Sequence, residues 1–141
     1  MDDTHPPDDL MLRVAAGGLR PLHLAGRVLL PIVQGGMGVG VSAHRLAGSV
    51  AAQGAVGTIS SVDLRRHHPD LMERTGHLRV GEAAKQAINA ANLEALEREI
   101  RAARSLAQGR GLLAVNVMRA VEAYAPSVRC ALEAGIDAVV V

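Results

Sequence analysis

The chain has 141 residues, 49% of them hydrophobic, and its 15 basic residues nearly balance its 14 acidic ones. It contains no Phe or Trp and a single Tyr, so it lacks both the stacking aromatics of single-strand binders and the basic surplus of duplex binders. We therefore expect no nucleic-acid partner. Ala, Val, Leu and Ile must form the core, as they do in parallel α/β sheets.

The cellular compartment is predicted from the cysteine count and the N-terminus. Cys130 is the only cysteine, so no internal disulfide forms and a reducing compartment is favoured. We interpret Cys130 as a small buried thiol of a helix rather than a nucleophile. No apolar run approaches the roughly 18 residues of a membrane span, and four aspartates crowd the first nine residues, unlike a signal peptide. The sequence thus predicts a cytoplasmic protein without a membrane partner.

Strands and helices are predicted to alternate along most of the chain. Residues 1–27 are expected to form a loose tail and an irregular segment, and residues 28–141 a regular domain. Four apolar runs predict strands, and they occupy residues 31–34, 55–60, 112–117 and 136–141. Helices are expected over residues 43–53, 81–90 and 93–108, and over a segment that begins near Pro126. Strands without polar alternation, separated by helices, predict parallel pairing and an α/β fold.

Three details of the predicted helices are specific enough to test. Ser42 and Asn92 each precede a predicted helix, and both residue types are preferred N-caps. In the last helix, Val128, Ala131 and Leu132 share one face and are expected to point inward.

The segment 34–43, with the sequence QGGMGVGVSA, is the motif richest in glycine. Glycines there let backbone N–H groups approach a ligand, and the helix start that follows is electropositive. A tight βα turn without a ligand is one alternative. Another is the Ala variant of the dinucleotide fingerprint, in which Gly38 and Gly40 bind the cofactor and Asp63 follows about twenty residues later.

Asn116 is a polar residue in an otherwise apolar predicted strand. It lies at the carboxyl end of that strand, where open α/β sheets and barrels carry their active sites. Its carboxamide both donates and accepts hydrogen bonds, so we interpret it as a ligand-binding residue. The alternative is that it satisfies the backbone of a neighbouring loop. Met37 and Met118 also follow strands, where each contacts a ligand or fills a gap.

Three histidines, His67, His68 and His77, lie in a polar segment after the second strand. A metal site needs three or four convergent ligands, and this group lacks the i, i+4 spacing of a helical metal motif. We therefore expect a solvated loop and no bound metal.

Several segments, taken together in their order and spacing, resemble the nitronate monooxygenases, formerly called 2-nitropropane dioxygenases. They are residues 31–37 (PIVQGGM), 47–54 (AGSVAAQG), 57–61 (GTISS), 114–118 (AVNVM) and 133–141 (EAGIDAVVV). Residues 62–70 (VDLRRHHPD) also look like a loop of one bacterial subgroup. The flavin-dependent enoyl-ACP reductases share the QGGM and VN motifs.

The resemblance implies a flavin-dependent oxidoreductase that binds FMN and oxidises alkyl nitronates with O₂ to a carbonyl compound and nitrite. It implies the N-terminal half of a (β/α)₈ TIM barrel over residues 28–141. The backbone of Gly35, Gly36 and Met37 would lie against the flavin, and Asn116 would hydrogen-bond to it. The catalytic residue is expected beyond Val141, so the chain alone is expected to be inactive and to self-associate through an open sheet edge.

Three alternatives remain from the sequence. They are an FMN-dependent enzyme like the enoyl-ACP reductases, an NAD-binding Rossmann protein, and a truncated remnant without catalysis. Strand order separates two architectures: a barrel places strands in chain order, whereas a Rossmann half places the first strand between the second and the fourth.

Overall fold

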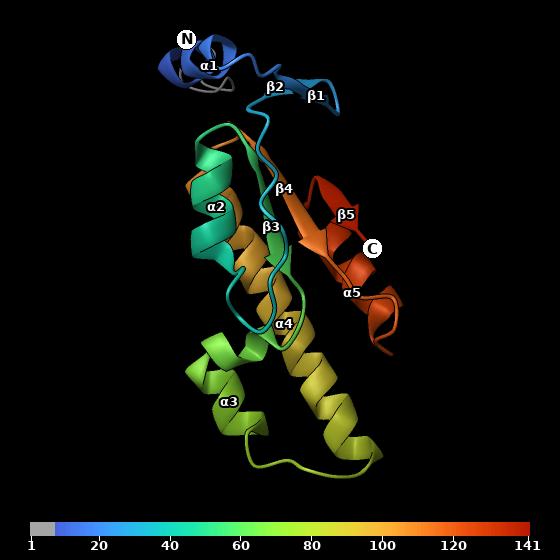
Figure 1. Ribbon diagram of the computed structural model, residues 1–141. Coiled ribbons are helices and arrows are strands. Elements are labelled where there is room, and N and C mark those ends of the chain that lie inside the picture. Colours follow the sequence, from blue (N-terminus) through green and yellow to red (C-terminus); the bar gives the residue numbers. More distant parts are fainter. Residues whose placement is uncertain (1–7) are drawn as a thin grey trace.

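The computed structural model describes residues 8–141 (Figure 1). The helices are α1 (Asp8–Ala16), α2 (His44–Ala52), the 3₁₀ helix η1 (Leu64–His67), α3 (Pro69–Thr75), α4 (Glu82–Ala107) and α5 (Tyr124–Glu133). The strands are β1 (Leu22–Leu24), β2 (Arg27–Leu29), β3 (Val56–Ser60), β4 (Leu112–Asn116) and β5 (Ala138–Val140). The predicted loose tail over residues 1–9 lies mostly outside the described residues. Residues 8–16 are helical.

The strands form two separate sheets. β1 and β2 pair as an antiparallel hairpin. β3, β4 and β5 form a parallel sheet in chain order, and Val33 adds one parallel bridge to Val56 of β3. The predicted α/β class and the parallel pairing of these strands therefore agree with the structure.

The expectation of half a TIM barrel with about four parallel strands is wrong. Residues 31–34 contribute a single bridge instead of a strand, and Ile32 and Val33 are 53% and 62% exposed. Pro31 has no N–H to donate, and the N–H of Ile32 bonds to the carbonyl of Leu30 at 2.8 Å. The preceding residues fold into the hairpin. A barrel needs a continuous ladder of tilted strands, and this ladder has only three.

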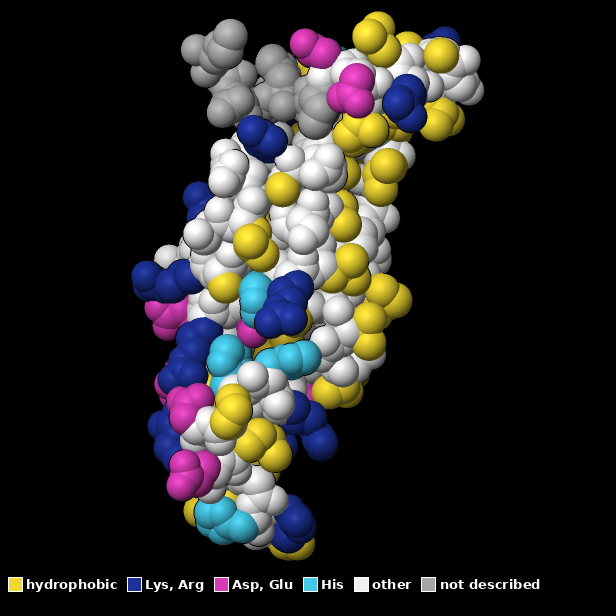
Figure 2. Space-filling view, turned by 90° about the vertical axis from the view of Figure 1, so that its left-hand side faces the viewer, with side chains coloured by type: hydrophobic (Ala, Val, Ile, Leu, Met, Phe, Trp, Pro, Cys, Tyr) yellow, Lys and Arg dark blue, Asp and Glu magenta, His cyan; other side chains and the backbone are white. Residues whose placement is uncertain are grey.

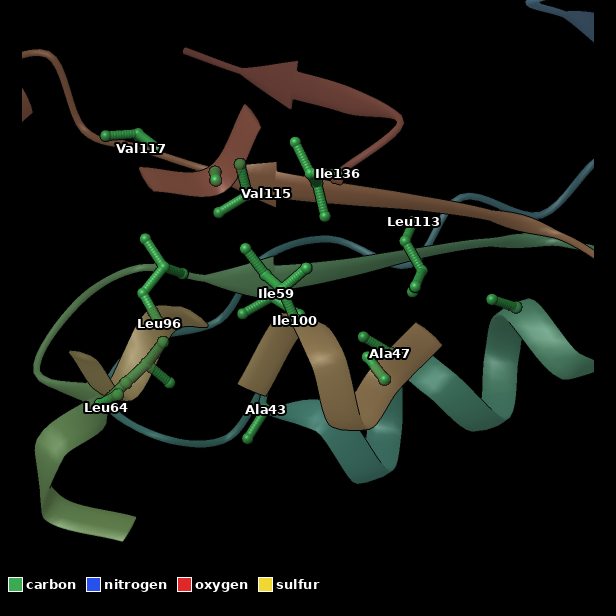
Figure 3. Packing of buried hydrophobic residues seen from close by; sticks show 14 of the residues in the cluster. Ala43, Ala47, Ile59, Leu64, Leu96, Ile100, Leu113, Val115, Val117 and Ile136 are labelled. Atoms are coloured by element: carbon green, nitrogen blue, oxygen red, sulfur yellow. The ribbon is translucent and has the colours of Figure 1, made fainter. Parts of the chain in front are cut away.

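The main core lies between one face of the parallel sheet and the helices. Ile59 of β3 points toward Ile100 of α4, and Leu96 and Val115 belong to the same cluster (Figure 3). A Cβ on Gly57 would overlap the carbonyl group of Ala47, so α2 lies directly on β3. The buried residues of this cluster are all aliphatic, as the composition predicted, and Tyr124 and Cys130 pack against its margin.

The opposite face of the sheet changes character along its length. At the amino end a small apolar cluster packs near the hairpin, and it consists of Leu29, Val56, Leu112 and Ala114. Because side chains alternate along a strand, the same face carries Thr58, Ser60 and Asn116 at the carboxyl end. The glycine-rich segment after Gln34 crosses this polar end.

Three local predictions about the helices are wrong. Residues 82–107 form one helix of 26 residues, and Asn92 lies inside it. The Asn92 amide donates to the Ser61 carbonyl at 2.8 Å and accepts the Arg65 N–H at 3.3 Å, so it joins α4 to the segment after β3. Ser42 does not cap α2, and Leu132 is 59% exposed. Within residues 8–141 no helix is long and apolar enough to cross a membrane.

The core assignment predicts unequal effects of the same substitution on two helices. Leu96→Ala should lower the free energy of unfolding by about 2–5 kcal/mol, because Leu96 is 0% exposed and the substitution leaves a cavity. Leu132→Ala, the matched control on α5, should change it by less than about 1 kcal/mol. Urea titration followed by circular dichroism measures both. Equal losses would contradict this placement of the core.

Candidate functional site

The side chain of Gln34 attaches the glycine-rich segment to the edge of β3. Its carbonyl oxygen accepts the backbone N–H of Thr58 at 2.9 Å. Its amide nitrogen donates to Ser42 Oγ at 2.9 Å and also contacts the carbonyl of Gly35. The side-chain oxygen of Gln34 therefore serves as the acceptor that a neighbouring strand's carbonyl would otherwise provide. It does so where the preceding segment leaves the sheet.

Ser42 closes the other end of this segment. It is fully buried, and its hydroxyl accepts the Met37 N–H at 2.9 Å and donates to the Gly35 carbonyl at 3.2 Å. The Ser42 carbonyl accepts the N–H of Ser60 at 2.9 Å. Ser42 thus folds the loop back onto β3, which explains why it does not cap α2. This role of Ser42 was not predicted from the sequence.

Gly36 rests directly on Asn116. A Cβ at Gly36 would lie 2.6 Å from the Cβ of Asn116 and 3.4 Å from Cγ2 of Thr58. Gly35 and Met37, on either side, are exposed. The four residues expected to bind the cofactor, namely Gly35, Gly36, Met37 and Asn116, thus lie together. We call them, with Gln34, Ser42 and Thr58, the glycine edge.

The carboxamide of Asn116 is half-buried. Its backbone carbonyl accepts the N–H of Ser61 at 3.0 Å, but within residues 8–141 no hydrogen bond to its side chain is found. The backbone N–H groups of Gly35 and Gly36 also have no partner in this part of the chain. The alternative in which Asn116 satisfies a neighbouring loop is therefore not what the structure shows.

The residues of the dinucleotide fingerprint are used for local contacts. Asp63 has a left-handed backbone (φ 53°) and pairs with Arg65 at 3.0 Å and with Arg66. A Cβ on Gly40 would overlap the ring of His67, so that ring covers the glycine. Val33 lies on the segment of the first predicted strand, and within the described residues it bridges only to β3. A Rossmann half would place this segment between β3 and β5, so the Rossmann order is not observed.

The three histidines of the polar segment differ in their surroundings. His67 and His77 are exposed, but His67 ends the 3₁₀ helix η1, so the expectation of a loop is wrong there. His68 is half-buried, and its Nε2 lies 3.0 Å from Oε1 of Glu99, so the expectation of a solvated side chain is wrong for this residue. Over residues 8–141, no group of three or more His, Cys, Asp or Glu side chains is arranged to hold a metal ion.

Two further residues that the sequence singled out, Cys130 and Met118, are not part of the glycine edge. Cys130, on α5, is only partly buried, and its thiol donates to the Leu93 carbonyl at 3.4 Å. Burial raises the pKa of the Cys130 thiol, which lowers its thiolate fraction and fits a packing role. Met118 follows β4 and is exposed.

Comparisons of the chain with models of protein families, with curated proteins and with solved structures found no match. The resemblance to nitronate monooxygenases therefore stays a hypothesis that depends on the motifs. The geometry of the glycine edge is the structural observation that bears on it.

The contact between Gly36 and Asn116 predicts that adjacent glycines differ in tolerance. Gly36→Ala should lower the free energy of unfolding by about 1–3 kcal/mol, because the added methyl has no room against Asn116. Gly35→Ala is the matched control, since nothing lies within 4 Å of its added methyl, and it should not destabilise the protein. Thermal unfolding of both variants tests this. Equal midpoints would show that the segment does not lie on Asn116.

Proposed function

We propose that the glycine edge binds FMN and that the chain supplies the cofactor-binding residues of a flavin-dependent oxidoreductase. The proposed reaction converts an alkyl nitronate and O₂ into a carbonyl compound and nitrite. The observation that supports this proposal is the carboxamide of Asn116, which has no hydrogen-bond partner within residues 8–141, beside the backbone of Gly36.

The residues present fit a flat heteroaromatic ring. Gly36 has no side chain, and the neighbouring Gly35 and Met37 are exposed, so the backbone is open to a planar ligand. The unpaired N–H groups of Gly35 and Gly36 offer donors. The Asn116 carboxamide offers one more donor group and an acceptor. A flavin ring has both carbonyl and N–H groups at its edge, and these would find partners here.

The protein's contribution is binding and orientation. When bound, FMN supplies the redox chemistry between the nitronate and O₂. Asn116 would fix the ring by hydrogen bonds, and residues 35–37 would lie against it. None of the side chains of the glycine edge titrates near neutral pH, so the edge itself provides no acid or base.

FMN binding tests the role of Asn116. Asn116→Leu should weaken FMN binding by about 1–3 kcal/mol, or roughly 5- to 150-fold, because the ring loses its partner. Asn89→Leu is the matched control, since Asn89 is also half-buried but lies on α4. Quenching of FMN fluorescence during titration with protein measures both affinities. Equal affinities for the wild type and Asn116→Leu would contradict the proposed site, as would a wild type that does not quench FMN.

Nitrite release separates binding from catalysis. With FMN and an alkyl nitronate in air, the chain alone should release nitrite no faster than free FMN does, because the glycine edge lacks a titratable side chain. Colorimetric determination of nitrite measures the rate. Release well above that of free FMN, and lost in Asn116→Leu, would show that these residues suffice for turnover. Rapid reduction of bound FMN by NADPH would instead favour the enoyl reductase alternative, because reduction of a C=C bond needs a hydride donor.

A further inference from the structure

A second polar site lies where the glycine-rich segment meets the start of α2. It is an open pocket of about 640 Å³, and its lining includes Gly40, His44, Arg45, His67, His68 and Glu99. Figure 2 shows histidine side chains gathered around a hollow on this face of the molecule. We call it the histidine pocket. It shares no residue with the glycine edge.

Glu99 lies at the base of the histidine pocket and joins three elements. Its side chain is 2% exposed, although it belongs to the charged residue types that are rarely buried without a partner. Oε2 accepts the backbone N–H of His44 at 2.7 Å and lies 2.6 Å from Nδ1 of the same residue. Oε1 lies 3.0 Å from Nε2 of His68. The carboxylate thus links α4 to the start of α2 and to the residue before α3.

These contacts determine which nitrogen of His44 carries the proton. Oε2 of Glu99 accepts the backbone N–H, so Nδ1 beside it is assigned as a donor as well. A neutral imidazole with Nδ1 protonated has its lone pair on Nε2. The His44 side chain is 33% exposed, and its Nδ1 edge faces the buried Glu99. Nε2 lies on the opposite edge of the ring, and within residues 8–141 no hydrogen bond to it is found.

We propose that His44 is a proton acceptor in the histidine pocket and that the pocket takes small 2-oxo acids. Arg45 would pair with the substrate carboxylate, and His67 would hydrogen-bond to the carbonyl oxygen. His44 is the catalytic residue of this proposal and Glu99 is a positioning residue, since it acts by holding the His44 ring.

The chemical step needs no other reactant. A C–H bond next to the carbonyl breaks, its electron pair forms an enolate, and the proton moves to Nε2 of His44. The proton on Nε2 exchanges with solvent, and its transfer from His44 back to the carbon restores the substrate and the neutral imidazole. The positive charge of Arg45 and of the protonated His44 would stabilise the enolate. In D₂O the result is exchange of the carbon-bound protons for deuterium. FMN takes no part in this step, so the proposal is independent of the flavin site.

Proton exchange of pyruvate tests the proposal. Loss of the methyl signal in D₂O, at about pH 8 where imidazoles are ordinarily neutral, is followed by proton NMR with the full chain. The wild type should exceed the buffer rate, and His44→Gln should return to it. Glu99→Gln should lower the rate roughly 10- to 100-fold. His77→Gln, the matched control at an exposed histidine, should match the wild type. Propanone, which lacks the carboxylate, should exchange more slowly than pyruvate.

A second measurement separates positioning from folding. Nitrogen-15 NMR of the wild-type imidazoles should show His44 with Nδ1 protonated and Nε2 bare, and Glu99→Gln should remove this preference. Wild-type exchange no faster than that of His44→Gln overturns the proposal. A wild-type His44 ring protonated at Nε2 also overturns the proposal. This measurement uses the wild type alone, so it holds even where Glu99→Gln fails to fold.

Discussion

The hydrogen bond from the Thr58 N–H to the Gln34 side chain holds the segment that contacts both candidate sites. The N–H groups along β3 need acceptors. Val56 finds one in the Ile32 carbonyl and Ser60 in the Ser42 carbonyl, but within residues 8–141 no backbone carbonyl accepts the Thr58 N–H between them. The Gln34 carboxamide supplies the partner and at the same time holds Ser42, which lies eight residues later. The glycine-rich segment between them is thereby kept as a closed loop over the polar end of the sheet. Ser42 adds hydrogen bonds to Gly35 and Met37 within the loop, so the two side chains together hold a segment whose glycines would otherwise adopt many conformations.

The strands that are buried on both faces were predicted correctly from the sequence. The prediction failed for residues 31–34, because a strand forms only where another element covers it. β3 and β4 were expected within one residue of their observed ends, because a continuous apolar run in a covered sheet has little other use. Residues 31–34 have a similar apolar character, but within residues 8–141 no element covers Ile32 and Val33, which remain exposed. A run of apolar residues indicates a preference for burial. It does not indicate whether the rest of the chain supplies a helix or strand that covers the run. The half-barrel expectation was wrong for this reason.

The glycine edge was predicted from the sequence, whereas the histidine pocket was not. The reason is the distance along the chain between the residues that form the pocket. The glycine-rich segment is recognised by its composition and Asn116 as the polar residue of an apolar strand, and the family resemblance points to Gly36 within that segment. Glu99 was missed, although a local signal existed: it follows Leu96 by three residues and precedes Ala103 by four, so it lies on the buried face of α4. A carboxylate on that face needs a partner, but the partner, His44, lies 55 residues away and no local pattern identifies it.

The glycine-rich segment contacts both candidate sites. Gly36 has no room against Asn116, and Gly40 has none against the ring of His67. Between these two contacts Met37 is fixed through both its N–H and its carbonyl by Ser42. Met37, Val39 and Val41, in contrast, are exposed, so the segment is held at particular points and is open to solvent elsewhere. It therefore reaches an uncharged, hydrogen-bonding edge at Gly36 and a histidine-lined pocket at Gly40, because glycine at each position leaves room for the neighbouring side chain.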